Sequence, residues 1–363
     1  MDDNNYITGL QGMGGTGKTT LATQVGKELQ KLKFFDHVVD TTVSYTPKIE
    51  TIQDDIAGPL GLQLKNYNES ERPKQLWSRL RNNEEKILVI LDDVWGPIDF
   101  EKIGIPSEGD HNGCRVLLTT RYVHVCNSMG CERGKIIQLD LLSDEDSWTL
   151  FQKHAGISDH PPKHLLQKGR EIVKECQGLP VAIAAIASTL KGQQSREKWD
   201  VTLKSLKKPM PMHGVDKDMT RFYKCLRYAY DDMKDEKTKE LFLLCSVFHE
   251  DEEISTEILT RYSVAMGIFG EVEDKYDDFR SQVVVAKNEL VDSCLLLKNA
   301  VGSAKMHDLV REAAQWIANN KIQVVKLFNN YHLKERRILD ICHAKERAWI
   351  SFLATLTLPS LRF

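Results

Sequence analysis

The stretch GMGGTGKTT, residues 12–20, decides the fold of this chain. It has the spacing G-x-x-x-x-G-K-[ST], in which glycines let backbone N–H groups curl around phosphate oxygens. An apolar strand candidate at residues 7–10 precedes it, and a helical pattern begins near Thr19. Because the motif requires this strand–loop–helix context, the stretch predicts a phosphate-binding loop at the start of a parallel sheet.

The side chains of this loop have separate predicted roles. Lys18 places a cation on the β and γ phosphates, and the Thr19 hydroxyl is a ligand for Mg²⁺. The N-terminus of the following helix adds its partial positive charge at the same point. The predicted nucleotide-binding residues of the loop are Gly12, Gly14, Gly15, Thr16, Gly17, Lys18, Thr19 and Thr20.

Two carboxylates come directly after the apolar run KILVIL, residues 86–91. A strand that ends in this way orders Mg²⁺ through its first carboxylate in P-loop proteins. Two acids after a strand are otherwise more typical of a solvated turn, so the phosphate-binding loop is what favours the metal. We predict that Asp92 ligates Mg²⁺ together with Thr19, and that Asp93 is the catalytic residue that orients or deprotonates a water.

From residue 6 to about 151, short apolar runs alternate with longer amphipathic stretches, as in a parallel sheet covered by helices. The predicted strands are residues 7–10, 37–43, 86–91 and 114–119. Arg121 follows the last of them, and ligands bind at the carboxyl ends of such strands. Arg121 is therefore a candidate γ-phosphate contact, although an arginine there is more often a surface charge.

Beyond residue 151 the apolar spacing becomes helical. Residues 208–214, KPMPMHG, hold two prolines and a glycine and are predicted to be a linker. After it we predict helices at residues 240–247, 283–293 and 308–319, a helix capped by Ser255, and a hairpin of residues 294–298 with 304–306. Three helices with a terminal hairpin are the winged-helix arrangement.

The predicted fold class is α/β: a P-loop NTPase parallel sheet flanked by helices, followed by a helical lobe and a winged-helix lobe. The predicted segments are a P-loop nucleotide-binding domain at 1–155, a helical lobe with the linker at 156–214, a winged-helix lobe at 215–322, and a C-terminal segment at 323–363 that begins a leucine-rich region. The 363 residues are too many for one core, which supports several lobes.

Composition narrows the class of protein. A net charge of −3 provides no overall field for nucleic acid, so no nucleic-acid partner is expected. The eight cysteines have no dense spacing and resemble the free thiols of an intracellular protein. The longest apolar stretch, residues 179–190, is shorter than the roughly 20 residues that cross a bilayer. With an acidic start, MDDNN, where a signal peptide would be basic, we expect a cytoplasmic location and leave peripheral membrane association open.

Seven motifs in order resemble the NB-ARC module of plant intracellular immune receptors of the coiled-coil class, within the signal-transduction ATPases. They are GMGGTGKTT (12–20), KILVILDDVW (86–95), GCRVLLTTR (113–121), LDLLSDEDSWTLFQKHAG (139–156), GLPVA (178–182), LFLLCSVFHED (241–251) and MHDLVREAA (306–314). GLPVA stands where the family more often has GLPLA. Thr41 and Thr42 stand where it usually has an aromatic residue.

The resemblance implies roles that periodicity does not show. It places Pro180 against the adenine base, His307 at the ADP phosphates and Arg121 at the γ-phosphate. Without it, Pro180 would be a break between two helices and His307 an ordinary residue between wing and helix.

The resemblance also implies a switch with ADP or ATP and Mg²⁺ as cofactors. ADP holds a closed state, ATP opens it and promotes oligomerisation and defence signalling, and slow hydrolysis resets it. The implied partners are adenine nucleotide, a second copy of the chain, and a pathogen effector or guarded host protein bound through regions beyond this sequence. Two alternatives stay open: a general P-loop NTPase or small-molecule kinase, and a winged-helix transcription regulator.

Overall fold

The computed structural model describes residues 6–320 except 82–83, 108, 110–112, 133, 159–161, 210–218, 250–251, 270–275 and 299–301. The predicted C-terminal segment at 323–363 and residues 210–214 of the predicted linker lie outside this part. The chain divides into two compact units. The first is Met1–Glu145 with Gly178–Val181, and the second is Asp146–Gln177 with Ala182–Phe363.

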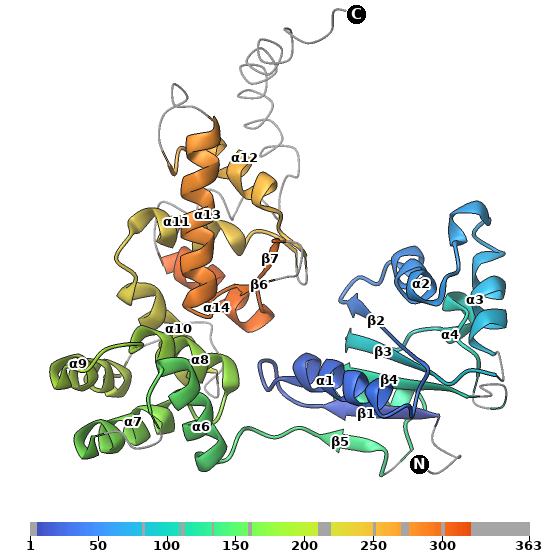
Figure 1. Cartoon of the computed structure of the whole chain (residues 1–363), viewed down its shortest axis with the longest axis horizontal. Helices are drawn as coiled ribbons and strands as arrows, with labels where there is room; N and C mark the ends of the chain where they lie inside the picture. The colour runs from blue at the N-terminus through green and yellow to red at the C-terminus, as the bar shows by residue number, and fades with distance from the viewer. Residues whose placement is uncertain are drawn as a thin grey trace, which may run out of the picture. The chain divides into compact units, whose positions relative to one another are not determined.

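A five-stranded parallel sheet forms the centre of the first unit, in the order β2-β3-β4-β1-β5 (Figure 1). Its strands are β1 (Ile7–Gln11), β2 (His37–Ser44), β3 (Ile87–Val94), β4 (Cys114–Thr120) and β5 (Ile136–Gln138). The four predicted strands are therefore confirmed, with small differences at their ends. The prediction missed β5, because three residues make too short an apolar run to stand out, and Ile137 is 54% exposed.

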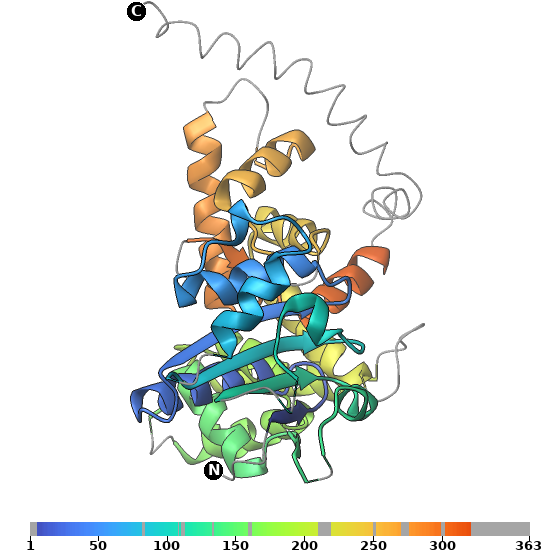
Figure 2. The same ribbon diagram turned by 90° about the vertical axis from the view of Figure 1, so that its right-hand side faces the viewer.

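Helices cover both faces of this sheet, whose strands run side by side in the turned view as well (Figure 2). The helices of the unit are α1 (Lys18–Lys31), α2 (Ile49–Ala57), α3 (Arg72–Leu80), α4 (Phe100–Ile103) and α5 (Val123–Ser128), with short 3₁₀ turns η1 (Gly58–Leu60) and η2 (Leu64–Asn66).

Strand β3 explains why the central strands read as unbroken apolar runs. Its residues alternate between two cores, because successive side chains of a strand point to opposite faces. Leu88 and Ile90 share a cluster with Ala22 of α1. Val89 belongs to the larger cluster that contains Ile52 of α2. Both faces of β3 are therefore covered, as parallel sheets require.

Within the described residues, the second unit consists of helices, one hairpin and an isolated β-bridge. Its helices are α6 (Asp144–Ala155), α7 (Lys163–Glu175), α8 (Pro180–Thr189), α9 (Arg196–Lys207), α10 (Thr220–Asp232), α11 (Glu236–Cys245), α12 (Thr256–Met266), α13 (Tyr276–Asp292) and α14 (Asp308–Asn320). The first residues of α6 and of α8 belong to the first unit. Helix α9 ends directly before the predicted linker.

The C-terminal part of this unit has the winged-helix order of elements. The hairpin pairs β6 (Leu297–Lys298) with β7 (Ala304–Lys305), and Ile254 forms an isolated bridge to Ala304. The chain thus runs through α11, the Ile254 bridge, α12, α13 and the hairpin. Ser255 caps α12 as predicted, since its Oγ accepts a hydrogen bond from Ile258 N at 3.2 Å.

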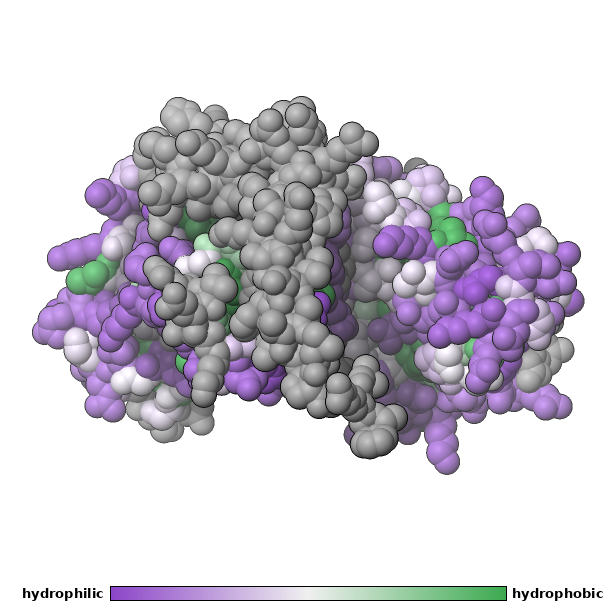
Figure 3. Space-filling view, turned by 90° about the horizontal axis from the view of Figure 1, so that it is seen from above, coloured by the Kyte–Doolittle hydropathy of each residue, from purple (hydrophilic) through white to green (hydrophobic). Residues whose placement is uncertain are grey.

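Polar and charged side chains dominate the surface that Figure 3 shows, with apolar residues scattered among them. Across the described residues, no helix combines the length and the apolar character needed to cross a membrane.

Candidate phosphate and magnesium site

The predicted phosphate-binding loop lies between β1 and α1, and its glycines meet backbone requirements. Gly15 and Gly17 have φ values of 79° and 93°, in the left-handed region that favours glycine. At Gly12 a side chain has no room, because a Cβ there would lie 2.5 Å from the backbone oxygen of Leu139. The conformation and the packing of this loop therefore both require glycine.

The Lys18 amine is held against this loop. Its Nζ donates hydrogen bonds to the backbone oxygens of Gly12 at 2.8 Å and Met13 at 2.9 Å, and the residue is only 8% exposed. Lys18 is also the first residue of α1, where helix N–H groups lack helical partners. The Lys18 amine, the backbone of the loop and the N-terminus of α1 thus lie next to one another, and this combination is suited to binding a phosphate.

The two predicted magnesium ligands lie together. Thr19 Oγ1 is 2.8 Å from Oδ2 and 3.0 Å from Oδ1 of Asp92. Asp92 is 6% exposed, and its Oδ1 accepts a second hydrogen bond from Thr119 Oγ1 at 2.6 Å. The carboxylate therefore has a fixed orientation toward the first turn of α1.

Strand β3 extends farther than the predicted strand at residues 86–91, and includes Asp92 and Asp93. The reason is the neighbouring strand, because Thr42 pairs with Asp92 and Ser44 with Val94. Asp92 is thereby anchored in the ladder and does not sit on a free turn.

The donor set fits Mg²⁺. A hydroxyl and a carboxylate supply hard oxygen ligands, and Mg²⁺ takes one or two protein groups and completes its shell with water and phosphate oxygens. Within the described residues, no group of three or more His, Cys, Asp or Glu side chains could hold a metal ion by itself. Thr19 and Asp92 are therefore suited to an ion that arrives with a phosphate ligand.

Asp93 lies beside this pair with a left-handed backbone, φ 54°, which aspartate adopts more readily than most residues. Its N–H donates to Thr119 Oγ1 at 2.9 Å, and its Oδ2 accepts from Trp95 Nε1 at 2.7 Å. Thr119 thus joins both aspartates. Neither Thr119 nor Trp95 was predicted to belong to the site.

Arg121 reaches the same edge of the sheet from β4. Its guanidinium carbon lies 4.6 Å from the centre of the Trp95 ring, a cation–π contact. A Cβ built on Gly14 would lie 3.4 Å from that carbon, so the guanidinium also lies beside the phosphate-binding loop. The structure therefore brings Arg121 together with the loop.

The remaining predicted residues of the first unit are Thr16, Thr20 and Pro180. Thr16 is buried, and its Oγ1 donates a hydrogen bond to the backbone oxygen of Met13 at 2.8 Å. Thr20 is exposed in the first turn of α1. Pro180 is the first residue of α8 and belongs to the segment Gly178–Val181, which clusters with the sheet unit. Leu142 N donates to Gly178 O at 2.9 Å, which ties this turn to the chain beyond β5.

His307 lies in the second unit, directly before α14. Its Nδ1 accepts a hydrogen bond from Leu309 N at 3.1 Å, so the imidazole caps this helix. The role of His307 toward a nucleotide remains a prediction.

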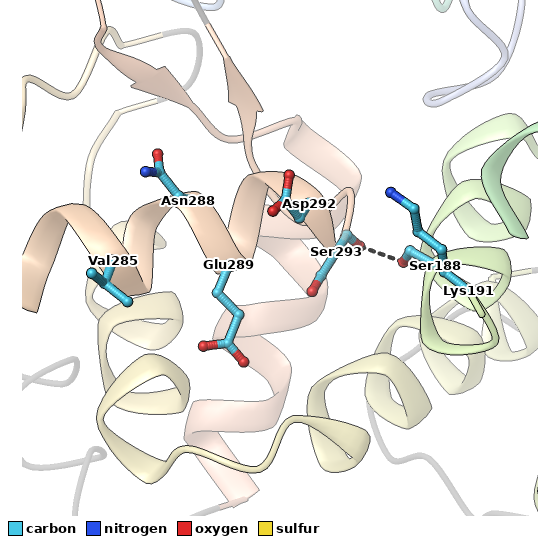
Figure 4. Close-up of a pocket in the computed structure, with 7 residues that line it drawn as sticks. All are labelled: Ser188, Lys191, Val285, Asn288, Glu289, Asp292 and Ser293. Atoms are coloured by element: carbon cyan, nitrogen blue, oxygen red, sulfur yellow. Dashed lines mark hydrogen bonds between the residues drawn. The ribbon is translucent and has the colours of Figure 1, made fainter. Parts of the chain in front are cut away.

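The second unit also contains an open recess of about 510 Å³ between the ends of α8 and α13 (Figure 4). It is lined by Ser188, Lys191, Val285, Asn288, Glu289, Asp292 and Ser293. Ser188 Oγ donates to the backbone oxygen of Ser293 at 3.0 Å across its floor. None of the predicted site residues lines it.

Comparisons with known proteins show which family this chain resembles. The family model of the NB-ARC domain matches residues 1–160. Disease resistance protein RFL1 of Arabidopsis thaliana is 33% identical over 326 residues, which cover 87% of this chain and 36% of the relative. Disease resistance protein SUMM2 of the same plant is 34% identical over 332 residues, with 88% and 36% covered. The chain thus spans little more than a third of the length of these relatives.

Among solved structures, a signal transduction ATPase with numerous domains from Pyrococcus horikoshii, which carries a tetratricopeptide repeat sensor, has a TM-score of 0.52. Its identity is 14%, with 91% of this chain and 44% of that chain covered, so the likeness shows the fold alone.

Proposed function

Because this chain contains an NB-ARC domain and is related over most of its length to disease resistance proteins of Arabidopsis thaliana, we propose that it is an adenine-nucleotide switch in plant defence. The observation that carries the proposal is the contact of Thr19 with Asp92, beside the loop that holds Lys18. In the same proposal, residues 1–155 bind the nucleotide, and 156–214 and 215–322 respond to it.

The site residues supply a phosphate-binding and metal-binding surface. Lys18 and the backbone N–H groups of the loop would bind the β and γ phosphates, and exchange of its contacts with Gly12 and Met13 frees the amine for them. Thr19 and Asp92 would hold Mg²⁺, which neutralises phosphate charge when it is bound. Asp93 would orient the water that attacks the γ-phosphate.

The switch requires that ADP and ATP stabilise different states, since equal binding of both states shifts nothing. Arg121 would favour ATP through the γ-phosphate, His307 would favour ADP, and Pro180 would pack on adenine. The closed state then carries ADP, and the open state carries ATP and self-associates. Slow hydrolysis resets it, so any ATPase activity is regulatory.

We place this switch in the cytoplasm, upstream of defence signalling. Recognition of a pathogen effector or guarded host protein belongs, in this proposal, to the parts of the relatives that this chain does not span.

The decisive experiment is mass spectrometry of nucleotide released by denaturing the purified chain. We expect ADP, ATP or both at close to one per chain. In Lys18→Ala we expect at least about a tenfold loss of nucleotide affinity, the size expected when a charged hydrogen-bond partner is removed.

Lys31→Ala is the matched control, because Lys31 lies at the other end of α1 with its side chain 76% exposed. It should retain nucleotide like the parent chain. A chain that neither carries nor binds an adenine nucleotide in calorimetry contradicts the proposal.

A further inference from the structure

Three neighbouring strands of the sheet end in aromatic residues close to the phosphate-binding loop. Tyr45 follows β2, Trp95 follows β3, and Tyr122 comes two residues after β4. The Trp95 ring lies 5.7 Å from the ring of Tyr45 at 85°, and 5.9 Å from that of Tyr122 at 60°. Edge-to-face and tilted contacts of this kind fix the orientation of a ring. The indole is therefore held in place from both sides.

The Trp95 indole contacts two residues of the proposed site, one through its N–H group and one through the face of its ring. Its N–H donates to Asp93 Oδ2 at 2.7 Å, and Asp93 is otherwise fixed through its own N–H on Thr119. Its π face carries the guanidinium of Arg121 at 4.6 Å. Trp95 thus contacts both Asp93 and Arg121.

We propose that Trp95 is a positioning residue that sets the Asp93 carboxylate through its N–H and the Arg121 guanidinium through its ring. This inference rests on the proposed function and extends it. The indole N–H can only donate, so it fixes which carboxylate oxygen faces away from the attacking water. The ring keeps the guanidinium beside Gly14 of the loop, where a γ-phosphate would meet it.

The two contacts can be removed separately. Trp95→Phe keeps an aromatic face for Arg121 and the packing with Tyr45 and Tyr122, but it has no N–H for Asp93. Trp95→Leu removes the aromatic face as well. Trp77→Phe is the matched control, because Trp77 carries Arg81 on its ring at 4.7 Å in α3, in a part of the first unit that supplies no site residue.

We expect Trp95→Phe to slow single-turnover hydrolysis of bound ATP about tenfold, while the ratio of ATP to ADP affinity stays within twofold of the parent chain. Trp95→Leu should slow hydrolysis equally and lower that ratio about fivefold, as expected for loss of a cation–π contact. Trp77→Phe should match the parent chain in the rate of hydrolysis and in the ratio of ATP to ADP affinity. A merely structural Trp95 would lower both nucleotide affinities together and would spare the hydrolysis of ATP that is bound.

A spectroscopic measurement tests the ring contact without hydrolysis or Mg²⁺. Arg121 changes its position on the indole if it turns to a γ-phosphate, so a non-hydrolysable ATP analogue should change tryptophan emission and ADP should not. This difference should vanish in Trp95→Phe and persist in Trp77→Phe.

The inference is overturned if Trp95→Phe hydrolyses bound ATP at the parental rate, or if its emission responds to the analogue as the parent does. Thermal unfolding of each variant shows whether it is folded. If Trp95→Leu is not folded, Trp95→Phe, the more conservative change, provides the test. If the parent chain binds no nucleotide, the proposed function itself is contradicted. This outcome differs from failure of the Trp95 inference, in which the parent chain binds nucleotide but the Trp95 variants behave like it.

Discussion

At the scale of single residues, Thr119 carries two hydrogen bonds that hold the site together. Its hydroxyl donates to Asp92 Oδ1 and accepts from Asp93 N, and the residue is 1% exposed. A buried donor that loses its only acceptor costs more than the bond itself contributes, because water cannot replace the acceptor. Thr119 therefore stabilises both the strand end and the orientation of the Asp92 carboxylate.

Thr119→Val keeps the shape of the side chain and removes both hydrogen bonds. We expect a loss of about 1–3 kcal/mol in the free energy of unfolding of the first unit, together with weaker Mg²⁺ binding. Calorimetric unfolding with and without Mg²⁺ measures both. Thr8→Val is the control, at a half-buried strand threonine of β1. Equal unfolding temperatures for the two variants would contradict this assignment.

Single residues also show what could be predicted from the sequence. A short, strict pattern predicted Lys18 and Thr19, and the two acids after an apolar run predicted Asp92. The structure places Asp92 against Thr19, next to Lys18. Trp95 and Thr119 were missed. The contacts of Thr119 with both aspartates and of Trp95 with Arg121 depend on β3 and β4 being neighbours, and this order comes from long-range packing that no local pattern records.

At the scale of elements, apolar runs identified the four long strands, and prolines placed the break after α9. Several elements had no individual prediction. Among them, β5 is a three-residue edge strand, and α10 was passed over although its buried residues Phe222, Cys225, Leu226 and Ala229 have helical spacing. Strand order could not be read from the sequence, although the position of the site depends on it.

The packing of β1 on α5 leads to a prediction at this scale. A Cβ on Gly9 would lie 2.6 Å from Cys126 Sγ, closer than real contacts allow, and 3.2 Å from Cys131 Sγ, which is a tight contact. We expect Gly9→Ala to lower the free energy of unfolding by about 1–3 kcal/mol, the usual cost of overpacking. Cys126→Ala in the same chain should recover part of this loss, because it removes the nearest atom.

The control for this pair is Gly58→Ala. Gly58 is exposed and a Cβ there would meet nothing within 4 Å. The free energy of unfolding of Gly58→Ala should therefore match that of the parent chain. Urea denaturation compares the variants. An unperturbed Gly9→Ala, or a double variant less stable than Gly9→Ala alone, would show that the strand and the helix can separate without cost.

At the scale of the whole molecule, the proposed switch depends on residues from both units. Gly178–Val181 cluster with the sheet although they lie between two stretches of the second unit, so the turn at Pro180 belongs to the unit that contains the phosphate-binding loop. The winged-helix order and the capping of α12 by Ser255 were predicted from the sequence. The role of His307 was not contained in any local pattern and came only from the resemblance to a family.

His307→Ala should lower the affinity for ADP relative to ATP about fivefold or more, within the range of coupling free energies between sites. Calorimetric titration with each nucleotide gives the ratio. His164→Ala, an exposed histidine of α7, serves as the control and should leave the ratio unchanged. If His307→Ala weakens both nucleotides to the same degree, the histidine does not distinguish them.

The central position of strand β3 affects how readily its backbone opens. Backbone amides exchange their protons last where central strands are covered on both sides, and first in exposed loops. β3 has partners on both edges over residues 87–91 and apolar cores on both faces, and Asp92 follows within the same strand, paired with Thr42 of β2. We therefore expect the backbone amide of Asp92, the proposed magnesium ligand, to exchange its proton more slowly than the amides of the surrounding loops.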